Sequence, residues 1–434
     1  MTKRNGEIAW APDRRLKGVE RALLPNGLTL LLAPLPAAKK TVVMLGVRVG
    51  SASEPRRLGG ISHFIEHLAF KSTPRLSCAE MARRVDALGG SLNAFTDTVA
   101  TVFELRAPSA TVTRGMPILF ESLVNDHFDR REFERERGVV LTEITGNLES
   151  PDDYARTQLY LPALFGEAPF ARPIDGRPEV VERLTVAEVR AWKARHYRPE
   201  NAVLAVAGSC ERAELDDAIG VTFARWRGRG RGRGSGRGSG RGSGSGSGRR
   251  AIERWEDMAQ VYLMLGVRTP SHRSRDASAL ALLSAVLGLG PSSRLFRLLR
   301  DDRGIGYDVI AEWESLGPAG HLVAAIPGFD PARFAEAERL IRRELARLTT
   351  EPVPERELDK AKALILAGHD DAVESPIFHA ESLIYREILG LSDDYRDLKP
   401  RIDAVNPVRL REVAARIFQR PLTLAALGPR DVEW

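Results

Sequence analysis

His63-Phe64-Ile65-Glu66-His67 places two imidazole side chains four residues apart, with a carboxylate just before the second of them. Residues i and i+4 lie on the same face of a helix, so His63 and His67 can direct their ring nitrogens at one metal ion. Glu66 would lie close enough to that ion to accept the proton of a bound water. Two histidines and one further protein ligand would leave a fourth position open, which is typical of a catalytic zinc.

The residues on either side of this motif favour a half-buried helix. Gly59 and Gly60 precede the motif, and the apolar residues 68–70 follow it. An apolar side of this kind is typical of a helix that packs against a core. The order His-x-x-Glu-His is also a known metallopeptidase signature, so it predicts a zinc-dependent hydrolase. The alternative is a helix that carries two solvated histidines and a surface glutamate.

The third ligand is expected from the segment 136–144, which reads Glu-Arg-Gly-Val-Val-Leu-Thr-Glu-Ile. Glu136 and Glu143 are seven residues apart, which is two turns along one helix face. One of them can bind the ion while the other orients a ligand histidine. Spacing alone does not distinguish Glu143 from Glu149 as the ligand. Glu136 could also be a solvated charge, because residues 130–137 alternate in sign.

Motifs that follow one another along nearly the whole chain resemble those of one family. They are LPNGL at 24–28, GGISHFIEH at 59–67, LGGSLNAFT at 88–96, VLTEI at 140–144, SPDD at 150–153, YRPEN at 197–201, SRLF at 293–296, RDDRGIGY at 300–307 and ESP at 374–376. The chain resembles the pitrilysin/insulinase metallopeptidase family, in the branch of half-length subunits that includes mitochondrial processing peptidase.

The resemblance implies a role for each residue of the motif. His63, His67 and Glu143 are then the zinc ligands, Glu66 is the catalytic base, and Glu136 is the supporting carboxylate. One zinc ion per chain is expected.

The second half of the chain has no His-x-x-Glu-His, so no second metal site is expected there. The resemblance instead implies that Arg300 and Tyr307 reach the substrate at the zinc. An arginine can hold a substrate carbonyl, and a tyrosine hydroxyl can donate to the oxyanion that forms on attack. The local sequence also fits a simpler interpretation, in which Arg300 caps a helix and Tyr307 is a half-buried strand residue.

Asn93-Ala94-Phe95 resembles the edge strand that takes up the substrate in this family. An extended peptide that adds to a sheet edge gains affinity from backbone pairing, while side-chain pockets set the preference. The alternative is an ordinary strand with Phe95 in the core.

Both halves show the same succession of strand, helices, paired strands, helices and final strand. This succession predicts an α+β fold with two homologous domains, each a mostly antiparallel sheet with helices packed on one face. Strands are expected at 28–32, 41–49, 91–95, 100–105 and 203–207, and again at 261–267, 309–313, 321–326 and 422–426. Besides the metal helix, helices are expected at 79–88, 112–124, 131–148, 276–287, 292–300, 331–348, 355–372 and 377–389. The expected boundaries are 1–225 for the zinc-binding domain, 226–250 for a linker and 251–434 for the metal-free domain that carries Arg300 and Tyr307.

The linker dominates the charge of the chain. Residues 227–250 are Gly, Ser and Arg only, and without their eight arginines the formal net charge of +6 becomes −2. Such a segment cannot bury apolar surface and should be a flexible tether. Arg-Gly repeats can also bind RNA without specificity, which is an alternative role.

With 434 residues, 43% of them hydrophobic, the chain is long enough to bury two sizeable cores. No stretch of apolar residues is long enough to span a membrane, and no signal peptide is evident. Cys78 and Cys210 alone do not make a disulfide framework, which favours a cytoplasmic protein.

The motif and the resemblance together predict a metalloendopeptidase. The resemblance alone implies that it cleaves unfolded polypeptides or short peptides inside a clamshell chamber. The resemblance implies a homodimer, with a heterodimer of family relatives as the alternative. Two other functions stay open, namely a non-catalytic or partner-dependent subunit of a processing peptidase and an RNA-binding protein. Neither membrane association nor specific nucleic-acid binding is expected.

Overall fold

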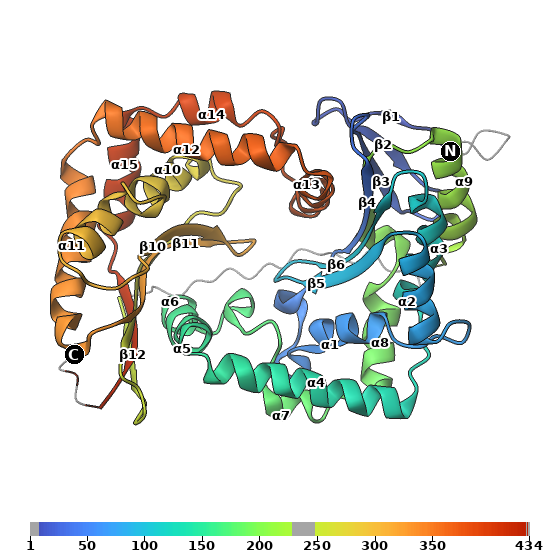
Figure 1. Cartoon of the computed structure of the whole chain (residues 1–434), viewed down its shortest axis with the longest axis horizontal. Helices are drawn as coiled ribbons and strands as arrows, with labels where there is room; N and C mark the ends of the chain where they lie inside the picture. The colour runs from blue at the N-terminus through green and yellow to red at the C-terminus, as the bar shows by residue number, and fades with distance from the viewer. Residues whose placement is uncertain (1–7, 228–247, 431, 433–434) are drawn as a thin grey trace. The chain divides into compact units, whose positions relative to one another are not determined.

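The computed structural model describes residues 8–227, 248–430 and 432 (Figure 1). The chain divides into two compact units. Unit 1 comprises Met1–Ile144, Pro173–Gly238 and Ala372–Arg396, and unit 2 comprises Thr145–Arg172, Ser239–Asp371 and Asp397–Trp434. Most of the expected linker, residues 228–247, lies outside the described residues.

Unit 1 is built on a seven-stranded sheet in the order β1-β2-β3-β7-β4-β6-β5. All neighbouring strands in it are antiparallel except β3 and β7, which are parallel. The strands are β1 (Ala11–Pro12), β2 (Glu20–Leu23), β3 (Thr29–Pro34), β4 (Lys40–Val47), β5 (Ser91–Thr96), β6 (Thr101–Pro108) and β7 (Ala202–Gly208).

Helices cover both faces of this sheet. The helix α13 packs on the face to which Val42 and Met44 of β4 point, whereas α3 contacts β4 and β6 from the other face (Figure 1). Because β4 is buried on both faces, it is a continuous apolar run and does not alternate with polar residues. The longer helices are α1 (Ile61–Ala69), α2 (Cys78–Ala87), α3 (Val112–Val124), α4 (Arg130–Glu149), α8 (Val186–His196), α9 (Arg212–Thr222) and α13 (Pro376–Leu389).

Unit 2 repeats this plan with a five-stranded sheet in the order β10-β11-β9-β12-β8. Only β12 and β8 are parallel among its neighbouring strands. The elements are β8 (Arg250–Arg254), β9 (Val261–Thr269), β10 (Ile310–Ser315), β11 (Gly320–Phe329), β12 (Thr423–Gly428), α10 (Ala277–Gly288), α11 (Phe334–Thr350), α12 (Glu355–Val373), α15 (Pro407–Phe418), the short α5 (Pro151–Tyr154) and α6 (Leu161–Phe165), and the π-helices η3 (Ala155–Tyr160) and η7 (Phe296–Asp301).

The predicted α+β class with two mostly antiparallel sheets is confirmed. The sheet of unit 1 differs from the expectation of helices on one face, because α13 from the second half of the chain covers its other face. Each strand expected from the sequence is present, with small differences at its ends. The elements that were not predicted include the short strands β1, β2 and β8 and the helices α5, α6, α7 (Pro178–Val181), α8, α9, α14 (Lys399–Asp403) and α15.

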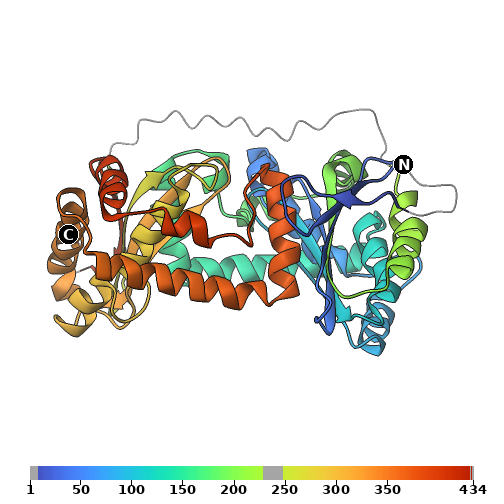
Figure 2. The same cartoon turned by 90° about the horizontal axis from the view of Figure 1, so that it is seen from above.

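The compact units differ from the contiguous ranges 1–225 and 251–434, because each contains a helical segment from the other half of the chain. We call residues 145–172 and 372–396 the exchanged segments. In unit 1, the helix α13 lies against the sheet (Figures 1 and 2). Its Leu383 and Ile384 pack with Met44 in one buried cluster. In unit 2, the fully buried Tyr160 of η3 lies over Gly266 of β9, where a Cβ atom would clash with its hydroxyl. Each segment is held by apolar packing between residues distant in sequence, which local patterns do not reveal.

An ionic contact also holds the exchanged segment of unit 1. The Glu387 carboxylate of α13 accepts hydrogen bonds from Arg15 at 2.6 Å, from Arg21 at 2.7 and 2.9 Å, and from Arg48 at 3.1 Å. Burial alone would raise the pKa of Glu387, but the three guanidinium groups lower it to about 2. The carboxylate is therefore charged at neutral pH and ties α13 to three parts of the N-terminal half.

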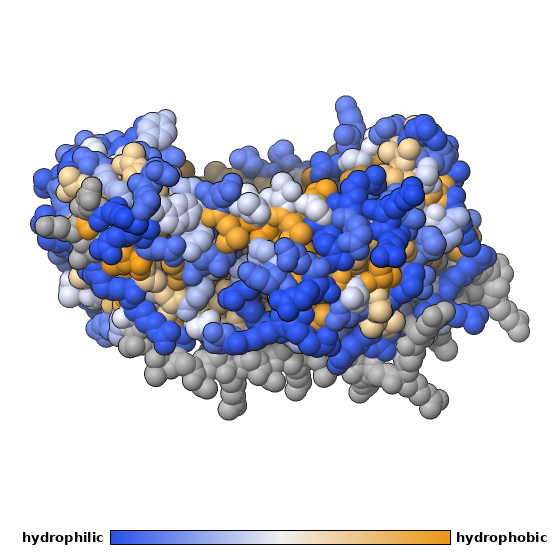
Figure 3. Space-filling model, turned by 90° about the horizontal axis from the view of Figure 1, so that it is seen from below, coloured by the Kyte–Doolittle hydropathy of each residue, from blue (hydrophilic) through white to orange (hydrophobic). Residues whose placement is uncertain are grey.

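Among the described residues, no helix combines the length and the apolar character that crossing a membrane requires. The side of the molecule in Figure 3 is mostly hydrophilic, with hydrophobic residues in separate patches between charged ones.

Candidate metal centre

The position of α1 is fixed at its first turn. Gly60, directly before the helix, has φ of 90°, and a Cβ atom there would clash with the carbonyl oxygen of Asp175. The buried carboxylate of Glu54 accepts hydrogen bonds from the backbone N–H groups of Gly60 at 2.7 Å and Ser62 at 2.8 Å. These N–H groups have no partner within the helix, and the helix dipole favours a negative charge beside them. Glu54 therefore holds the helix that carries both motif histidines.

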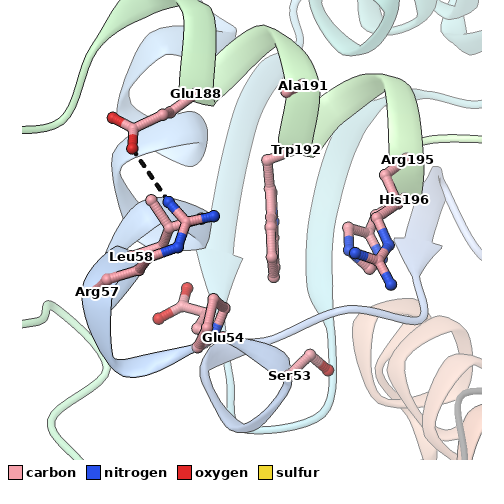
Figure 4. A pocket seen from close by; sticks show the side chains of 10 residues that line it. Ser53, Glu54, Arg57, Leu58, Glu188, Ala191, Trp192, Arg195 and His196 are labelled. Atoms are coloured by element: carbon pink, nitrogen blue, oxygen red, sulfur yellow. Dashed lines mark hydrogen bonds and ion pairs between the residues drawn. The ribbon is translucent and has the colours of Figure 1, made fainter.

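Glu54 also lines a pocket of about 420 Å³ between the segment that leads into α1 and the helix α8 (Figure 4). Arg57 and Glu188 form an ion pair of 3.2 Å across this pocket. Farther along α8, Trp192 lies in the middle of the pocket lining and His196 at the end away from this pair, and burial lowers the pKa of His196 to about 4. None of the predicted site residues lines this pocket, so it is separate from the motif chemistry.

Three of the predicted site residues meet where α1 faces α4. His63, His67 and Glu143 each offer a ligand atom, and these atoms lie within 4.8 Å of one another. Nε2 of His63 is 3.6 Å from Oε1 of Glu143, and Nε2 of His67 is 3.2 Å from its Oε2. Within the described part of the chain, this is the group of His, Cys, Asp and Glu side chains that could hold a metal ion. Spacing alone did not distinguish Glu143 from Glu149 as the third ligand, and this geometry favours Glu143.

Glu136 lies on the other side of His67. Its Oε2 is 3.7 Å from Nδ1 of His67, while its Oε1 is 2.8 Å from Nζ of Lys71. Glu136 is only 5% exposed, which argues against the solvated surface charge considered above. A carboxylate beside the second ring nitrogen of a ligand can fix the orientation of the imidazole. Lys71 was not predicted, although it follows His67 by four residues and could have been found by that spacing.

The charge state of His63 suits metal binding. Burial, together with the neighbouring His67, lowers the pKa of His63 to about 4, and the charge of Glu143 opposes this shift. At neutral pH His63 is therefore neutral, which is the form of imidazole that binds metal ions.

Glu66 projects from α1 toward the strand β5. The hydroxyl of Thr96 donates a hydrogen bond of 2.8 Å to Oε2 of Glu66. Burial raises the pKa of Glu66 to about 7, against the effect of the Thr96 hydrogen bonds and with a smaller contribution from the charge of Glu143. A carboxylate with a pKa near neutrality can both accept and return a proton. The sequence did not predict that Thr96 contacts this group.

The segment Asn93-Ala94-Phe95 lies in β5, which is the outermost strand of its sheet. Its open edge agrees with the predicted mode of peptide uptake, and that role stays a prediction. Phe95 also packs partly against a buried cluster, as the alternative interpretation required. The two interpretations are compatible, because backbone pairing at an edge does not need an exposed side chain.

Arg300 and Tyr307 lie together in unit 2. Arg300, in η7, donates a hydrogen bond of 3.1 Å to the Tyr307 backbone carbonyl, and its guanidinium lies 4.1 Å from the centre of the tyrosine ring. Tyr307 is 72% exposed and precedes β10, so it is not the half-buried strand residue of the simpler interpretation. The catalytic role of the pair stays a prediction.

A helix with two histidines, opposite a helix that supplies a carboxylate, defines the metal centre of a class of zinc peptidases. Residues 30–175 match the family model described as insulinase (peptidase family M16), and residues 183–365 match the one described as peptidase M16 inactive domain. The chain belongs to peptidase family M16.

Two relatives are named zinc proteases and are uncharacterized. One, from Mycobacterium leprae, is 32% identical over 96% of this chain and 93% of its own length. The other, from Streptomyces coelicolor, is 26% identical over 95% of this chain and 90% of its own length.

Solved structures show the same fold. A protease from Helicobacter pylori superimposes with a TM-score of 0.86 at 22% identity, over 95% of this chain and all of that chain. A peptidase M16 inactive domain from Pseudomonas fluorescens gives 0.84 at 18% identity, over 96% of this chain and 99% of that chain.

Proposed function

We propose that this chain is a zinc-dependent endopeptidase that hydrolyses unfolded polypeptides or short peptides. The observation that carries the proposal is the convergence of His63, His67 and Glu143, with Glu66 on the same helix. The names of the relatives support zinc as the metal. Membership of the family supports peptide bonds as the substrate.

The donors fit zinc. Two imidazoles and one carboxylate are ligands that catalytic zinc sites use, and they leave one coordination position open. When bound there, zinc would act as a Lewis acid and lower the pKa of water to near neutrality.

Two side chains would carry out proton transfer and ligand orientation. Glu66 accepts the proton of the attacking water and passes it to the leaving amine, for which its raised pKa is suited. Glu136 keeps the ring of His67 in the orientation that the ligand set requires.

The substrate would lie along β5, where residues 93–95 offer an open strand edge for backbone pairing. In this proposal Arg300 holds the substrate carbonyl, and the Tyr307 hydroxyl donates to the developing oxyanion. We propose that both act in a homodimer, in which each copy supplies the pair to the other. A heterodimer with a family relative would use the same residues.

Hydrolysis of an unstructured peptide, followed by mass spectrometry, tests this function in wild type and in the Glu66→Gln variant. The proposal expects cleavage by the wild type and none by the variant, because glutamine keeps the shape of glutamate but cannot accept the proton. Equal cleavage by both proteins would remove Glu66 from the mechanism. If neither protein cleaves, the chain alone is not a peptidase, and a partner-dependent subunit becomes the better account.

A further inference from the structure

Thr96 joins two parts of the candidate site. It is the last residue of β5, where it pairs with Thr101 of β6, and its hydroxyl donates to Glu66 of α1 at 2.8 Å. The other edge of β5 has no neighbouring strand in the sheet of unit 1. Thr96 therefore connects the strand proposed to take up substrate with the group proposed to move the proton.

Glu66 needs such a partner because its side chain is long. Three side-chain torsions separate its carboxylate from the backbone, and the residue is only half-buried. Among the hydrogen bonds of the described residues, the side-chain donor to this carboxylate is Thr96. Since a carboxylate oxygen bound to a hydroxyl keeps a defined position, the opposite oxygen also keeps a defined direction.

We propose that Thr96 is a positioning residue that holds the Glu66 carboxylate for proton transfer and links its orientation to the backbone of β5. The inference rests on the function proposed above and extends it. Threonine suits this role because its branched Cβ restricts the first side-chain torsion, so the hydroxyl direction follows the strand backbone. A peptide paired along β5 would restrain that backbone and thereby the base.

Three variants separate this role from simple packing. Thr96→Val replaces the hydroxyl with a methyl group of similar size, and Thr96→Ser keeps the hydroxyl. Thr101→Val is the matched control, since Thr101 is the partner of Thr96 across the strands, but its hydroxyl donates to the carbonyl of Val49 at 2.9 Å and not to Glu66.

The measurement is kcat and KM for one unstructured peptide, with the zinc content of each protein determined in parallel. Loss of a group that orients a catalytic residue costs about 10–100-fold, so Thr96→Val should lower kcat by that factor with little change in KM. Thr96→Ser should retain most of kcat. Thr101→Val should lower the melting temperature and leave kcat near that of wild type.

Wild-type kcat in Thr96→Val would overturn the proposal. An equal loss of kcat in Thr96→Ser and Thr96→Val would do the same, because the hydroxyl would then not matter. If wild type hydrolyses no peptide, the proposed function fails, and crystal structures of the zinc-loaded wild type and Thr96→Val decide the inference on its own. The carboxylate of Glu66 should turn away in the variant, and an unchanged carboxylate position would contradict the inference.

Discussion

The central strands of the two units share five residues and use them in the same way. Residues 44–48, the end of β4 and the position after it, and residues 264–268 of β9 both read Met-Leu-Gly-Val-Arg. In each unit the glycine leaves space for a side chain of the exchanged segment. Ile384 lies against Gly46 in unit 1, and Tyr160 lies against Gly266 in unit 2. The arginines then bind that segment, since Arg48 donates to the Glu387 carbonyl at 2.9 Å and Arg268 to the Leu164 carbonyl at 2.5 Å. In both units, a glycine and an arginine of the shared sequence therefore contact the exchanged segment.

The helices that come next along the chain differ. In unit 1, α1 follows β4 and carries both histidines and Glu66, whereas in unit 2 α10 follows β9 and carries apolar residues such as Leu280, Leu283 and Val286, which are fully buried. Both helices contact the next strand pair, α1 at β5 and α10 at β10. If the proposed function is correct, one position in the fold serves chemistry in unit 1 and core packing in unit 2. Changes in α1 should therefore affect activity, and changes in α10 should affect stability.

Removal of the metal should have the largest effect on activity. Treatment with a chelator should abolish peptide hydrolysis, and added zinc should restore it. The melting temperature should fall on chelation and recover with zinc, because an ion that binds only the folded state stabilises it. Hydrolysis that survives complete removal of the metal would contradict the role given to α1.

A substitution that creates a cavity beside α10 should lower stability without changing activity. Leu283 is fully buried in the core of unit 2, so Leu283→Ala should lower the free energy of unfolding by about 2–5 kcal/mol. The activity of the folded fraction should stay that of wild type, which kcat measured well below the melting temperature would check. A loss of kcat without a loss of stability would break the contrast between the two helices.

The two shared glycines allow a finer comparison. The nearest atoms to a Cβ atom at Gly46 belong to the side chains of Ile384 and Ile388, whereas at Gly266 they include the Leu322 backbone carbonyl. Overpacking costs about 1–3 kcal/mol, and the higher values arise where the neighbours cannot move. Gly266→Ala should therefore destabilise the protein more than Gly46→Ala in denaturant unfolding. The reverse order would show that the Leu322 backbone carbonyl does not make Gly266 the less tolerant of the two positions.

The smallest effect concerns the charge on Glu387 that fixes α13. Its folded-state pKa of about 2 is lower than its ordinary value, so its contribution to stability is complete above pH 4.5 and is lost as the pH falls toward 2. Glu387→Gln should remove this part of the acid destabilisation, which melting temperatures measured between pH 2 and 5 would reveal. An unchanged pH dependence in the variant would contradict the assigned role.

Much of the fold could be predicted, because both halves carry strong periodic patterns. The strands β4 and β9 are continuous apolar runs, and the helix α3 was predicted at its observed bounds, Val112–Val124. The exchanged segments could not be predicted from local patterns, since their helices pack on strands far away in the sequence. The repeated Met-Leu-Gly-Val-Arg is the sequence signal that could have indicated the matching surfaces.

In the candidate site too, some residues could be predicted from the sequence and others could not. His63, Glu66 and His67 follow from spacing within one helix. Glu143 was distinguished from Glu149 only by the family resemblance, and the structure places Glu143 beside the two histidines. Thr96 contacts Glu66 from thirty residues away, and Glu54 holds α1 through a loop. Contacts of this kind depend on tertiary structure and leave no periodic pattern in the sequence.

The zinc content of purified wild type and of the His67→Ala variant, measured by mass spectrometry after saturation with zinc and removal of the excess, tests the central claim most directly. The account predicts one zinc ion per chain in wild type and essentially none in the variant, with both proteins folded. Equal zinc in the two proteins, or none in wild type, would contradict a metal centre at His63, His67 and Glu143.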